Sequence, residues 1–441
     1  MAADFLYGLL PEHLLLGVII SLMLLEMFRV DARWARRVFV VATLAGLAAV
    51  IQQLATGYGA DVVAGEIVVD RLALVGKLVI LACALALAVA FAARESFKHW
   101  LLVASSTLGA LVILDSAGFA SLFIGIEMLS LPAFALMVHG RGNTVASEGA
   151  FKYLVLSSVA SALLLFGVSL GYGGTGTLSI AAWTQRLAQP GALAKAASLL
   201  VLCGLFLKAA VFPLHAWAPD AYASARMPVT ALLASIVKAA VVLALLRVVS
   251  TAPLDAASCT VVAVLAIASI VFGNLAALGQ QRFRRLLAYS SVAHAGYMIF
   301  ALLDTTGNRV DDLLLYTAIY ALGTLLACAS YAALNPGDDD DLQPLDGKFA
   351  SQPVAALLLS LAVLSLAGVP PFPGFFAKLF VFRSVVASGY LVPAVIAFVG
   401  SFLGLAYYVG IVVRLFRTDT RTKNEEASPT DAEAAIGRVT A

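Results

Sequence analysis

The stretch LKAAVFPLHAWAPDAYASA, residues 207–225, follows an unbroken apolar run. Within a segment of membrane-like composition it carries Lys208, the helix-breaking Pro213, His215 and Asp220. A charged side chain and a broken helix both cost free energy in hydrocarbon, because no water is present to satisfy the charge or the freed backbone groups. The stretch therefore predicts a broken membrane helix whose charges and free carbonyl groups serve a function.

The composition places the whole chain in a membrane. Of its 441 residues, 62% are apolar and only 12% are charged, and the mean hydropathy is +0.97. Soluble domains contain about a quarter charged residues. The net charge of +2 is too small to indicate nucleic-acid binding. The four cysteines stand singly in apolar runs without metal-ligand spacing, so we expect them to be small core residues.

Apolar runs predict an all-α polytopic membrane protein with about thirteen transmembrane helices, since a span needs about 20 mostly apolar residues. Prolines interrupt the seventh helix at Pro213 and the twelfth at Pro370, Pro371 and Pro373. The polar tail at residues 416–441 is expected to be disordered. The predicted spans are residues 11–28, 37–55, 71–93, 99–114, 116–138, 149–172, 194–212, 228–248, 257–278, 284–303, 311–334, 352–382 and 388–413.

Basic residues predict the orientation of these spans. The loops after the first, third, fifth and ninth spans are rich in Lys and Arg, as in QQRFRR at residues 280–285. The loops on the other side, such as DVVAGEIVVD at residues 61–70, are poor in both. Because basic loops stay in the cytoplasm, the N-terminus is predicted outside and the C-terminus in the cytoplasm. The acidic loop 335–349 falls on the cytoplasmic side, and acidic residues weigh little in this rule.

Ionisable side chains inside the spans are candidate functional residues, because each costs roughly 2.5–3.5 kcal/mol on insertion scales. Glu127, Lys208, Lys238 and Lys378 lie nearest the middle of their spans, and His294 is less central. Burial disfavours the charged form of a lysine and a nearby carboxylate restores it. One acid and three lysines on four helices therefore predict a proton relay. The alternative is that the lysines and the acid only pair for stability and that His294 is a satisfied core histidine.

Other charged residues lie nearer the ends of their spans or in the broken segment and are weaker candidates for the relay. Lys152 lies three residues into its span, so it either reaches the surface or acts as an accessory site together with His215 and Asp220. Lys77 lies seven residues into its span and is expected to extend to the surface in a structural role. The sequence has no metal-ligand spacing, nucleotide-binding loop, haem attachment motif or iron–sulfur cysteine cluster, so we expect no metal or cofactor on this chain.

Two proline-interrupted segments stand in the two halves of the chain. They are KAAVFPLHAWAP at residues 208–219 and AGVPPFPGFFAK at residues 367–378. Lys208 precedes the first proline of its segment by five residues, and Lys378 follows the last proline of its segment by five. That opposite order fits segments of opposite orientation. A pair of interrupted segments predicts an inverted-repeat transporter core with its site at the breaks.

At these residues the chain resembles the antiporter-like membrane subunits of respiratory complex I, most closely the subunit N group of bacterial NADH-quinone oxidoreductases. The matching stretches cover most of residues 120–415 in the same order. They are FIGIEMLSLPAFAL (123–136), EGAFKYLVLSSVASALLLFGVSLGYGGTGTL (148–178), LKAAVFPLHAWAPDAY (207–222), PVTALLASIVKAAV (228–241), SIVFGNLAALGQQRFRRLLAYSSVAHAGYM (269–298) and LSLAGVPPFPGFFAKLFVF (364–382).

The resemblance implies two inverted five-helix repeats and a hydrated polar axis across the bilayer. It implies that Glu127, Lys208, Lys238, His294 and Lys378 form this axis, because each matches a position that the family uses. The implied domains are N-terminal helices 1–3 at residues 1–98, the first repeat at 99–248, the second repeat at 249–415 and the cytoplasmic tail at 416–441. Typical family members have a fourteenth helix, which lies outside both repeats.

The function implied by the resemblance is proton translocation within NADH-quinone oxidoreductase. Its partners would be other membrane subunits of the complex, in the bacterial inner membrane. NADH, FMN, iron–sulfur clusters and quinone would be bound in or near other subunits, and none by this chain. The alternatives are a subunit of a cation/proton antiporter or of a membrane-bound hydrogenase-type complex, and a structural spacer in which the charges only pair.

Overall fold

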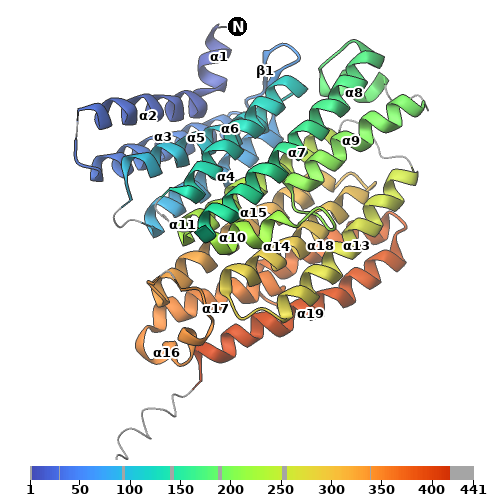
Figure 1. The fold of residues 1–441 in the computed structure, drawn as a ribbon. Coiled ribbons are helices and arrows are strands. Elements are labelled where there is room, and N and C mark those ends of the chain that lie inside the picture. Colours follow the sequence, from blue (N-terminus) through green and yellow to red (C-terminus); the bar gives the residue numbers. More distant parts are fainter. Residues whose placement is uncertain are drawn as a thin grey trace, which may run out of the picture.

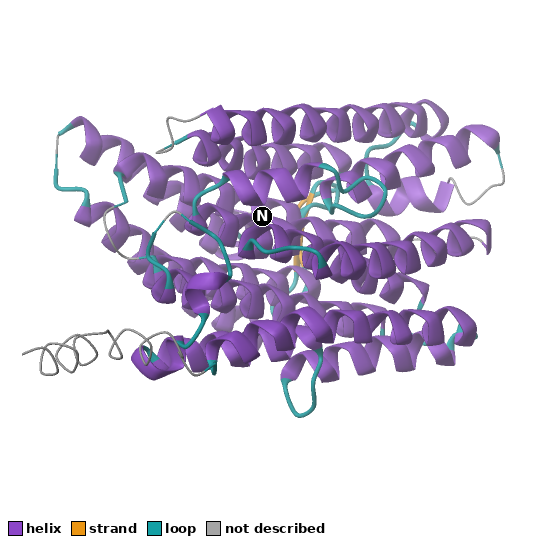
Figure 2. Ribbon diagram, turned by 60° about the horizontal axis from the view of Figure 1, so that its bottom comes forward, coloured by secondary structure: helices purple, strands orange, loops and turns teal. Residues whose placement is uncertain are grey.

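The computed structural model describes residues 2–28, 30–91, 95–139, 144–186, 191–250, 256–337 and 339–417. Nearly all of the described chain is helical, and the long helices run side by side in one bundle (Figure 2). Among the described residues, eleven helices are long and apolar enough to cross a membrane. The predicted all-α polytopic membrane protein is thus confirmed. The tail that was expected to be disordered lies, from residue 418 onward, outside the described residues.

The helices occupy the apolar runs, and a short hairpin joins two of them. The elements of the first half are α1 (Ala2–Gly8), α2 (Leu10–Met27), α3 (Arg33–Ala55), β1 (Ala60–Val63), β2 (Ile67–Val69), α4 (Arg71–Ala90), α5 (Phe97–Asp115), α6 (Phe119–Val138), α7 (Thr144–Thr175), α8 (Ile180–Arg186), α9 (Ala192–Lys208), α10 (Trp217–Ser224), α11 (Met227–Leu232), the π-helical η1 (Leu233–Val237) and α12 (Lys238–Ser250).

The second half is entirely helical where it is described and has regular structure. Its elements are α13 (Ala256–Leu278), α14 (Phe283–Phe300), the 3-10 turn η2 (Ala301–Leu303), α15 (Arg309–Leu334), the 3-10 turn η3 (Gln343–Leu345), α16 (Lys348–Ser351), α17 (Pro353–Ala367), α18 (Pro373–Ala387) and α19 (Leu391–Leu415).

Local sequence signals fix several helix ends. Asp70 caps α4 by accepting a hydrogen bond from the Ala73 amide at 2.8 Å, and Ser96 caps α5 in the same way. These side chains satisfy backbone amides that have no partner inside the helix. Gly368 ends α17 in the left-handed region at φ 83°, which glycine adopts without steric cost. Local capping residues and glycine thus determine where these helices begin and end.

Both predicted helix breaks are present. The chain leaves regular helix between α9, which ends at Lys208, and α10, which begins at Trp217. It does so again between the end of α17 at Ala367 and the start of α18 at Pro373. With 17 and 15 residues, α9 and α17 are too short to be among the eleven long spans. The count of thirteen membrane crossings stays a prediction.

The centre of the bundle is the helix formed by α11, η1 and α12. Every residue of its most apolar stretch is buried, against 28% in α2 and 33% in α19. Figure 1 shows α2 and α3 along one side of the bundle and α19 along the other, with α4 and α15 between them. An apolar helix buried on all faces is the core of a large protein, and one buried on a third of its surface is available to lipid.

The two halves share one packing feature. A Cβ at Gly109 of α5 would overlap the backbone of α6, and a Cβ at Gly273 of α13 would overlap the backbone of α14. Small residues let membrane helices approach closely. The first two helices of each predicted repeat, α5 with α6 and α13 with α14, therefore pack closely at a glycine. This likeness agrees with two repeats at residues 99–248 and 249–415. Their inverted relation and these domain boundaries stay predictions.

The hairpin β1–β2 covers one end of the bundle. It pairs antiparallel, with Ala60 opposite Val69, and its turn reaches the junction of α5 and α6, where the Ala117 amide donates to the Glu66 carbonyl at 2.8 Å. Figure 1 shows β1 and α8 near one end of the bundle and α16 at the opposite end. The side of the membrane on which each end lies remains a prediction.

Candidate functional site

The first helix break is held open by hydrogen bonds from neighbouring segments. The Trp217 indole donates to the Leu207 carbonyl at 2.7 Å, and the Phe212 amide donates to the Ser269 hydroxyl at 3.0 Å. Ala210 has φ 54°, which is in the left-handed region that non-glycine residues rarely adopt. Such backbone persists only where surrounding contacts determine it. The break is therefore a built feature, and it leaves the Ala209 carbonyl free of an intrahelical partner.

Lys208 ends the first half of the broken helix among three polar side chains. Its Nζ lies 2.7 Å from the Ser157 hydroxyl, 3.1 Å from the Ser130 hydroxyl and 3.5 Å from Glu127 Oε1. Lys208 is 7% exposed, whereas the Glu127 side chain is 28% exposed. Glu127 also accepts a hydrogen bond from Ser161 of α7. The structure thus brings the predicted acid and the first predicted lysine together.

A small cavity joins Lys208 to the central helix. It has about 10 Å³ of room, which is about what a single water molecule requires. Ser130, Ser157 and Lys208 line one part of it, and Val237 and Val241 of the central helix line another. Lys238, the next predicted lysine, directly follows Val237 in the chain. The cavity thus lies between Lys208 and the turn of the central helix that carries Lys238.

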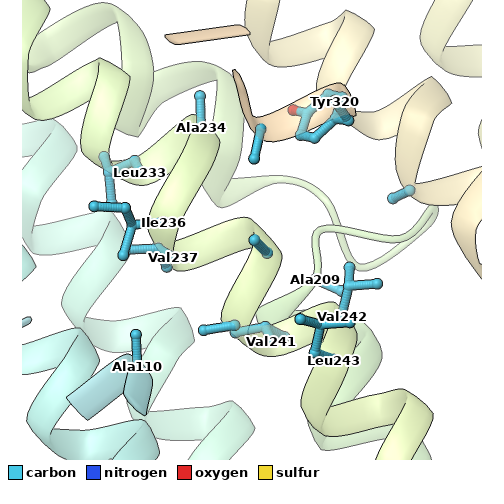
Figure 3. Packing of buried hydrophobic residues seen from close by; sticks show 14 of the residues in the cluster. Ala110, Ala209, Leu233, Ala234, Ile236, Val237, Val241, Val242, Leu243 and Tyr320 are labelled. Carbon is cyan, nitrogen blue, oxygen red and sulfur yellow. The ribbon is translucent and has the colours of Figure 1, made fainter. Parts of the chain in front are cut away.

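Lys238 begins α12 directly after the π-helical turn η1 and is 3% exposed. Its Nζ donates to the Ala209 carbonyl at 2.5 Å and to the Ser291 carbonyl of α14 at 3.2 Å. Figure 3 shows apolar side chains of this helix, including Val237 and Val242, with Ala209 of the first break beside them. π-helical turns occur often at functional sites. Lys238 links the first break to α14.

His294 lies on α14, one turn beyond Ser291, inside a group of tyrosines. Its Nδ1 is 2.8 Å from the Tyr316 hydroxyl, and its Nε2 is 3.5 Å from the Tyr408 hydroxyl. The ring of Tyr320 lies 4.9 Å from the imidazole, centroid to centroid. His294 is buried and its two nitrogens have hydroxyl partners. The histidine is therefore satisfied in the core, and the same hydroxyl groups can pass a proton to it.

The second break presents the last predicted lysine, Lys378. Its Nζ donates to the Ala367 carbonyl at 2.8 Å, which is the carbonyl left open where α17 ends. The same nitrogen lies 4.9 Å from the centre of the Tyr297 ring, a cation–π contact. Tyr297 stands on α14 three residues after His294. The charged groups therefore follow one another from Glu127 through α14 to Lys378.

The predicted accessory residues lie in other surroundings. Lys152 is 44% exposed and contacts Glu148 and Asp220, each at 2.8 Å, while Arg285 lies 3.6 Å from Asp220. This ion-pair group joins α7, α10 and α14. Within the described chain, its ion pairs do not include Lys208 or Lys238.

His215 lies in the first break and is half-buried among aromatic rings. Its ring centre is 4.7 Å from that of Phe272 and 5.4 Å from that of Phe212. Pro213 precedes it in the same loop, and Pro370, Pro371 and Pro373 mark the second break as predicted. Among the described residues, no group of three or more metal-binding side chains was found.

The expectation for Lys77 is wrong. Its side chain is 0% exposed and its Nζ lies 2.9 Å from Glu12 Oε1 and 2.8 Å from Asp115 Oδ2. Asp115, which the sequence placed in a loop, is the last residue of α5 and is 1% exposed. Lys77 does not extend to the surface because two neighbouring helices bring carboxylates to it. The available signal was Glu12 within the first apolar run.

Buried lysines at two helix breaks, with a carboxylate at the first, define a polytopic membrane protein of the antiporter-like class. The family model described as "NADH:quinone oxidoreductase/Mrp antiporter" matches residues 116–404, a range that contains both breaks and all of these lysines. The chain belongs to the NADH:quinone oxidoreductase/Mrp antiporter family of transmembrane proteins.

Relatives and solved structures agree with this assignment. The NADH-quinone oxidoreductase subunit N of Pelobacter propionicus is 55% identical, over 98% of this chain and 93% of its own length. A chain in the respiratory complex I of Thermus thermophilus with bound aureothin is 33% identical with a TM-score of 0.81, over 92% of this chain and 90% of its own. A chain of the Mrp complex from Dietzia sp. is 25% identical with a TM-score of 0.85, over 95% of this chain and 81% of its own.

Proposed function

We propose that this chain is the proton-translocating membrane subunit N of an NADH-quinone oxidoreductase. The single observation that carries the proposal is a row of ionisable groups through the bundle: Glu127 pairs with Lys208, Lys238 binds the carbonyl groups of Ala209 and Ser291, and Lys378 lies against Tyr297 of α14. The 55% identity to a subunit N over nearly the whole chain supports the assignment to that complex. Its partners are the other membrane subunits of the same complex.

Proton movement in this proposal begins at Glu127 and Lys208. An ionised Glu127 favours the charged form of Lys208, and a neutral Glu127 weakens that preference. The hydroxyl groups of Ser130 and Ser157 hold the lysine in place in both states. A proton released from Lys208 passes through the water-sized cavity toward Lys238.

The second part of the relay runs along α14. Lys238 is bound to the Ser291 carbonyl, one turn from His294, whose Nδ1 contacts the Tyr316 hydroxyl. Tyr297, on the next turn, lies against Lys378. The three lysines are each held by hydrogen bonds to buried carbonyl or hydroxyl groups, so in this proposal they change charge without a large rearrangement of the helices.

The remaining assignments follow from that role. The redox chemistry, with NADH, FMN, iron–sulfur clusters and quinone, belongs to neighbouring subunits, and this chain acts as a non-redox part of the translocase. We place it in the bacterial inner membrane with its N-terminus outside and its C-terminus in the cytoplasm, as the distribution of basic loops predicts.

Alanine variants of the two central lysines test the proposal. Lys208→Ala and Lys238→Ala are each compared with Lys195→Ala, which changes an exposed lysine of the same helix α9. NADH-driven proton uptake into inverted membrane vesicles is measured together with the amount of assembled complex. Both central variants should lose most pumping while assembly is retained and the control pumps normally. Wild-type pumping in both central variants would refute the relay.

A second candidate function is cation/proton antiport without redox drive. The family model and the likeness to a chain of the Mrp complex favour keeping it. The discriminating measurement is the internal pH of vesicles given a Na⁺ or K⁺ gradient with neither NADH nor quinone present. A pH change that depends on Lys208 under these conditions supports antiport, and its absence together with NADH-driven pumping supports the proposed function.

A further inference from the structure

A third group of buried charges lies outside the relay, in the N-terminal helices. Glu12 of α2, Lys77 of α4 and Asp115 of α5 form this N-terminal charge cluster. Lys77 Nζ lies 2.9 Å from Glu12 Oε1 and 2.8 Å from Asp115 Oδ2. The side chains are 9%, 0% and 1% exposed, in the order Glu12, Lys77 and Asp115. Three elements therefore bring two carboxyl groups to one ammonium group away from water.

The charges of the cluster do not balance when all three groups are ionised. Two carboxylates against one ammonium leave one negative charge without compensation. An uncompensated buried charge is strongly destabilising. One additional proton on the two carboxyl groups removes the imbalance.

The neighbouring ionisable groups do not compensate the extra negative charge of the cluster. Arg247 of α12, which donates to the Leu114 carbonyl beside Asp115, has its guanidinium bound to both oxygens of Asp70 at 2.9 Å. The carboxyl group of Glu66, in the hairpin turn, faces the Ser121 amide at 3.2 Å. Burial raises the pKa of the Tyr58 hydroxyl, so Tyr58 stays neutral. His13 of α2 packs edge-on against Phe5, with ring centres 5.2 Å apart.

The hydrogen-bonding pattern has room for that proton. Glu12 Oε2 and Asp115 Oδ1 are buried and accept no hydrogen bond within the part of the chain that the structure describes. Two carboxyl groups that contact the same nitrogen are neighbours, and like charges at that range favour protonation of one of them. A proton on either group supplies the donor that these oxygens lack.

A polar path leads from the surface to the backbone carbonyl that precedes Asp115. Asp70, at the end of the β1–β2 hairpin, is 42% exposed and holds Arg247. Arg247 Nη2 also donates to the Leu114 carbonyl at 2.6 Å, and Leu114 directly precedes Asp115. The hairpin turn contacts the same region, since Ile67 pairs with Ser116. The path gives the cluster a polar contact with the hairpin end of the bundle that does not involve the relay lysines.

We propose that Glu12 and Asp115 share one exchangeable proton beside Lys77, which makes the N-terminal helices a proton-binding site separate from the relay. On release, the O–H bond of the carboxyl group breaks, the proton passes to water at the hairpin end, and a carboxylate remains. The lysine stays charged throughout and holds the two carboxyl groups together. The site takes a proton and requires no other reactant.

Infrared spectroscopy of the purified intact complex tests the proposal. Difference spectra between a low and a high pH, in H₂O and in D₂O, report the C=O absorption of protonated carboxylic acids, which shifts on deuteration. Glu12→Gln and Asp115→Asn should each lose the same part of this absorption. Glu26→Gln, an exposed glutamate on the same helix α2, should retain it.

Two results would overturn the proposal. One is a carboxylic-acid absorption that is the same in wild type and in both variants. The other is a failure of both variants to assemble, because a neutral amide of the same shape replaces a group that shares a neutralising proton and should be tolerated. The measurement needs no turnover, so either result leaves the Lys208–Lys238 relay untouched, and loss of pumping in the relay variants leaves this site untouched.

Discussion

The two helix breaks share one contact. At the first break, Lys238 donates to the Ala209 carbonyl, and at the second break Lys378 donates to the Ala367 carbonyl. Both carbonyl groups stand at the end of a helix, where the last four have no intrahelical partner. A buried ammonium group satisfies the carbonyl, and the carbonyl gives the ammonium an acceptor. Each break thus holds a buried lysine by the same hydrogen bond, from the ammonium group to a free helix-end carbonyl.

The breaks differ in what surrounds the charge. The first break also ends on Lys208, which has Glu127 at 3.5 Å. Lys378 has the Tyr297 ring at 4.9 Å, and no carboxylate forms an ion pair with it among the described residues. A carboxylate can change its own charge and so switch its lysine, whereas an aromatic ring cannot. In the proposed relay, this difference assigns regulation of the proton to the first break, and only its holding and release to the second.

The largest effect is expected from Gly374→Ala at the second break. A Cβ there would overlap the Ser365 carbonyl oxygen, and the Gly374 amide donates to the Ser365 hydroxyl at 3.1 Å. Overpacking of this kind costs about 1–3 kcal/mol. The variant should lower the melting temperature and yield of the assembled complex, while Gly410→Ala, with open space at its Cβ, should not. Equal stability of the two variants would show that the second break is not tightly packed.

Lys378→Met tests whether the second break carries a proton at all. Methionine keeps much of the side-chain length and removes the charge, so assembly should persist. The rate of NADH-driven proton pumping should fall about tenfold, equivalent to about 1.4 kcal/mol on the barrier. The exposed Lys195→Met on α9 serves as the control. Normal pumping by Lys378→Met would reduce the second break to a structural lysine.

Glu127→Gln should make the first break resemble the second. Lys208 would keep the Ser130 and Ser157 hydroxyl groups and lose its switchable partner. Partly exposed ion pairs contribute about 0.2–1 kcal/mol, so pumping should fall by up to about fivefold. Measuring the single variants of Glu127 and Lys208 and the double variant gives the coupling between them. Additive losses would mean that the two residues act independently.

The smallest effect is expected from Tyr297→Phe. Phenylalanine keeps the ring face beneath Lys378, so pumping should change by less than about twofold. Tyr297→Leu removes the ring and a cation–π contact of about 1 kcal/mol, and should reduce pumping more. The ratio of the two variants, measured in the same vesicles, reports the ring contact. A large loss of pumping in Tyr297→Phe would show that pumping depends on the hydroxyl group and not on the ring.

The sequence was informative where one residue decides the outcome. Proline cannot donate its backbone amide to a helix, and both breaks lie at prolines, although Pro132 stands inside α6 without ending it. A lysine in the middle of an apolar segment cannot face lipid cheaply, and Lys208, Lys238 and Lys378 are all buried. The prediction that Lys77 extends to the surface was wrong. The position of this lysine near a span end permitted an exposed side chain, but Glu12 of α2 and Asp115 of α5 meet it inside the bundle.

Composition and position along the chain by themselves determined the membrane class, the broken helices and the residues that had to be hidden from lipid, because these depend on transfer free energies of single segments. Tertiary structure alone decided which partner each hidden charge meets. Glu127 reaches Lys208 across 81 residues, and Glu12 and Asp115 meet at Lys77, because an ion pair between helices depends on their relative rotation and depth. Those quantities follow from the packing of whole helix faces, which no short stretch of sequence encodes.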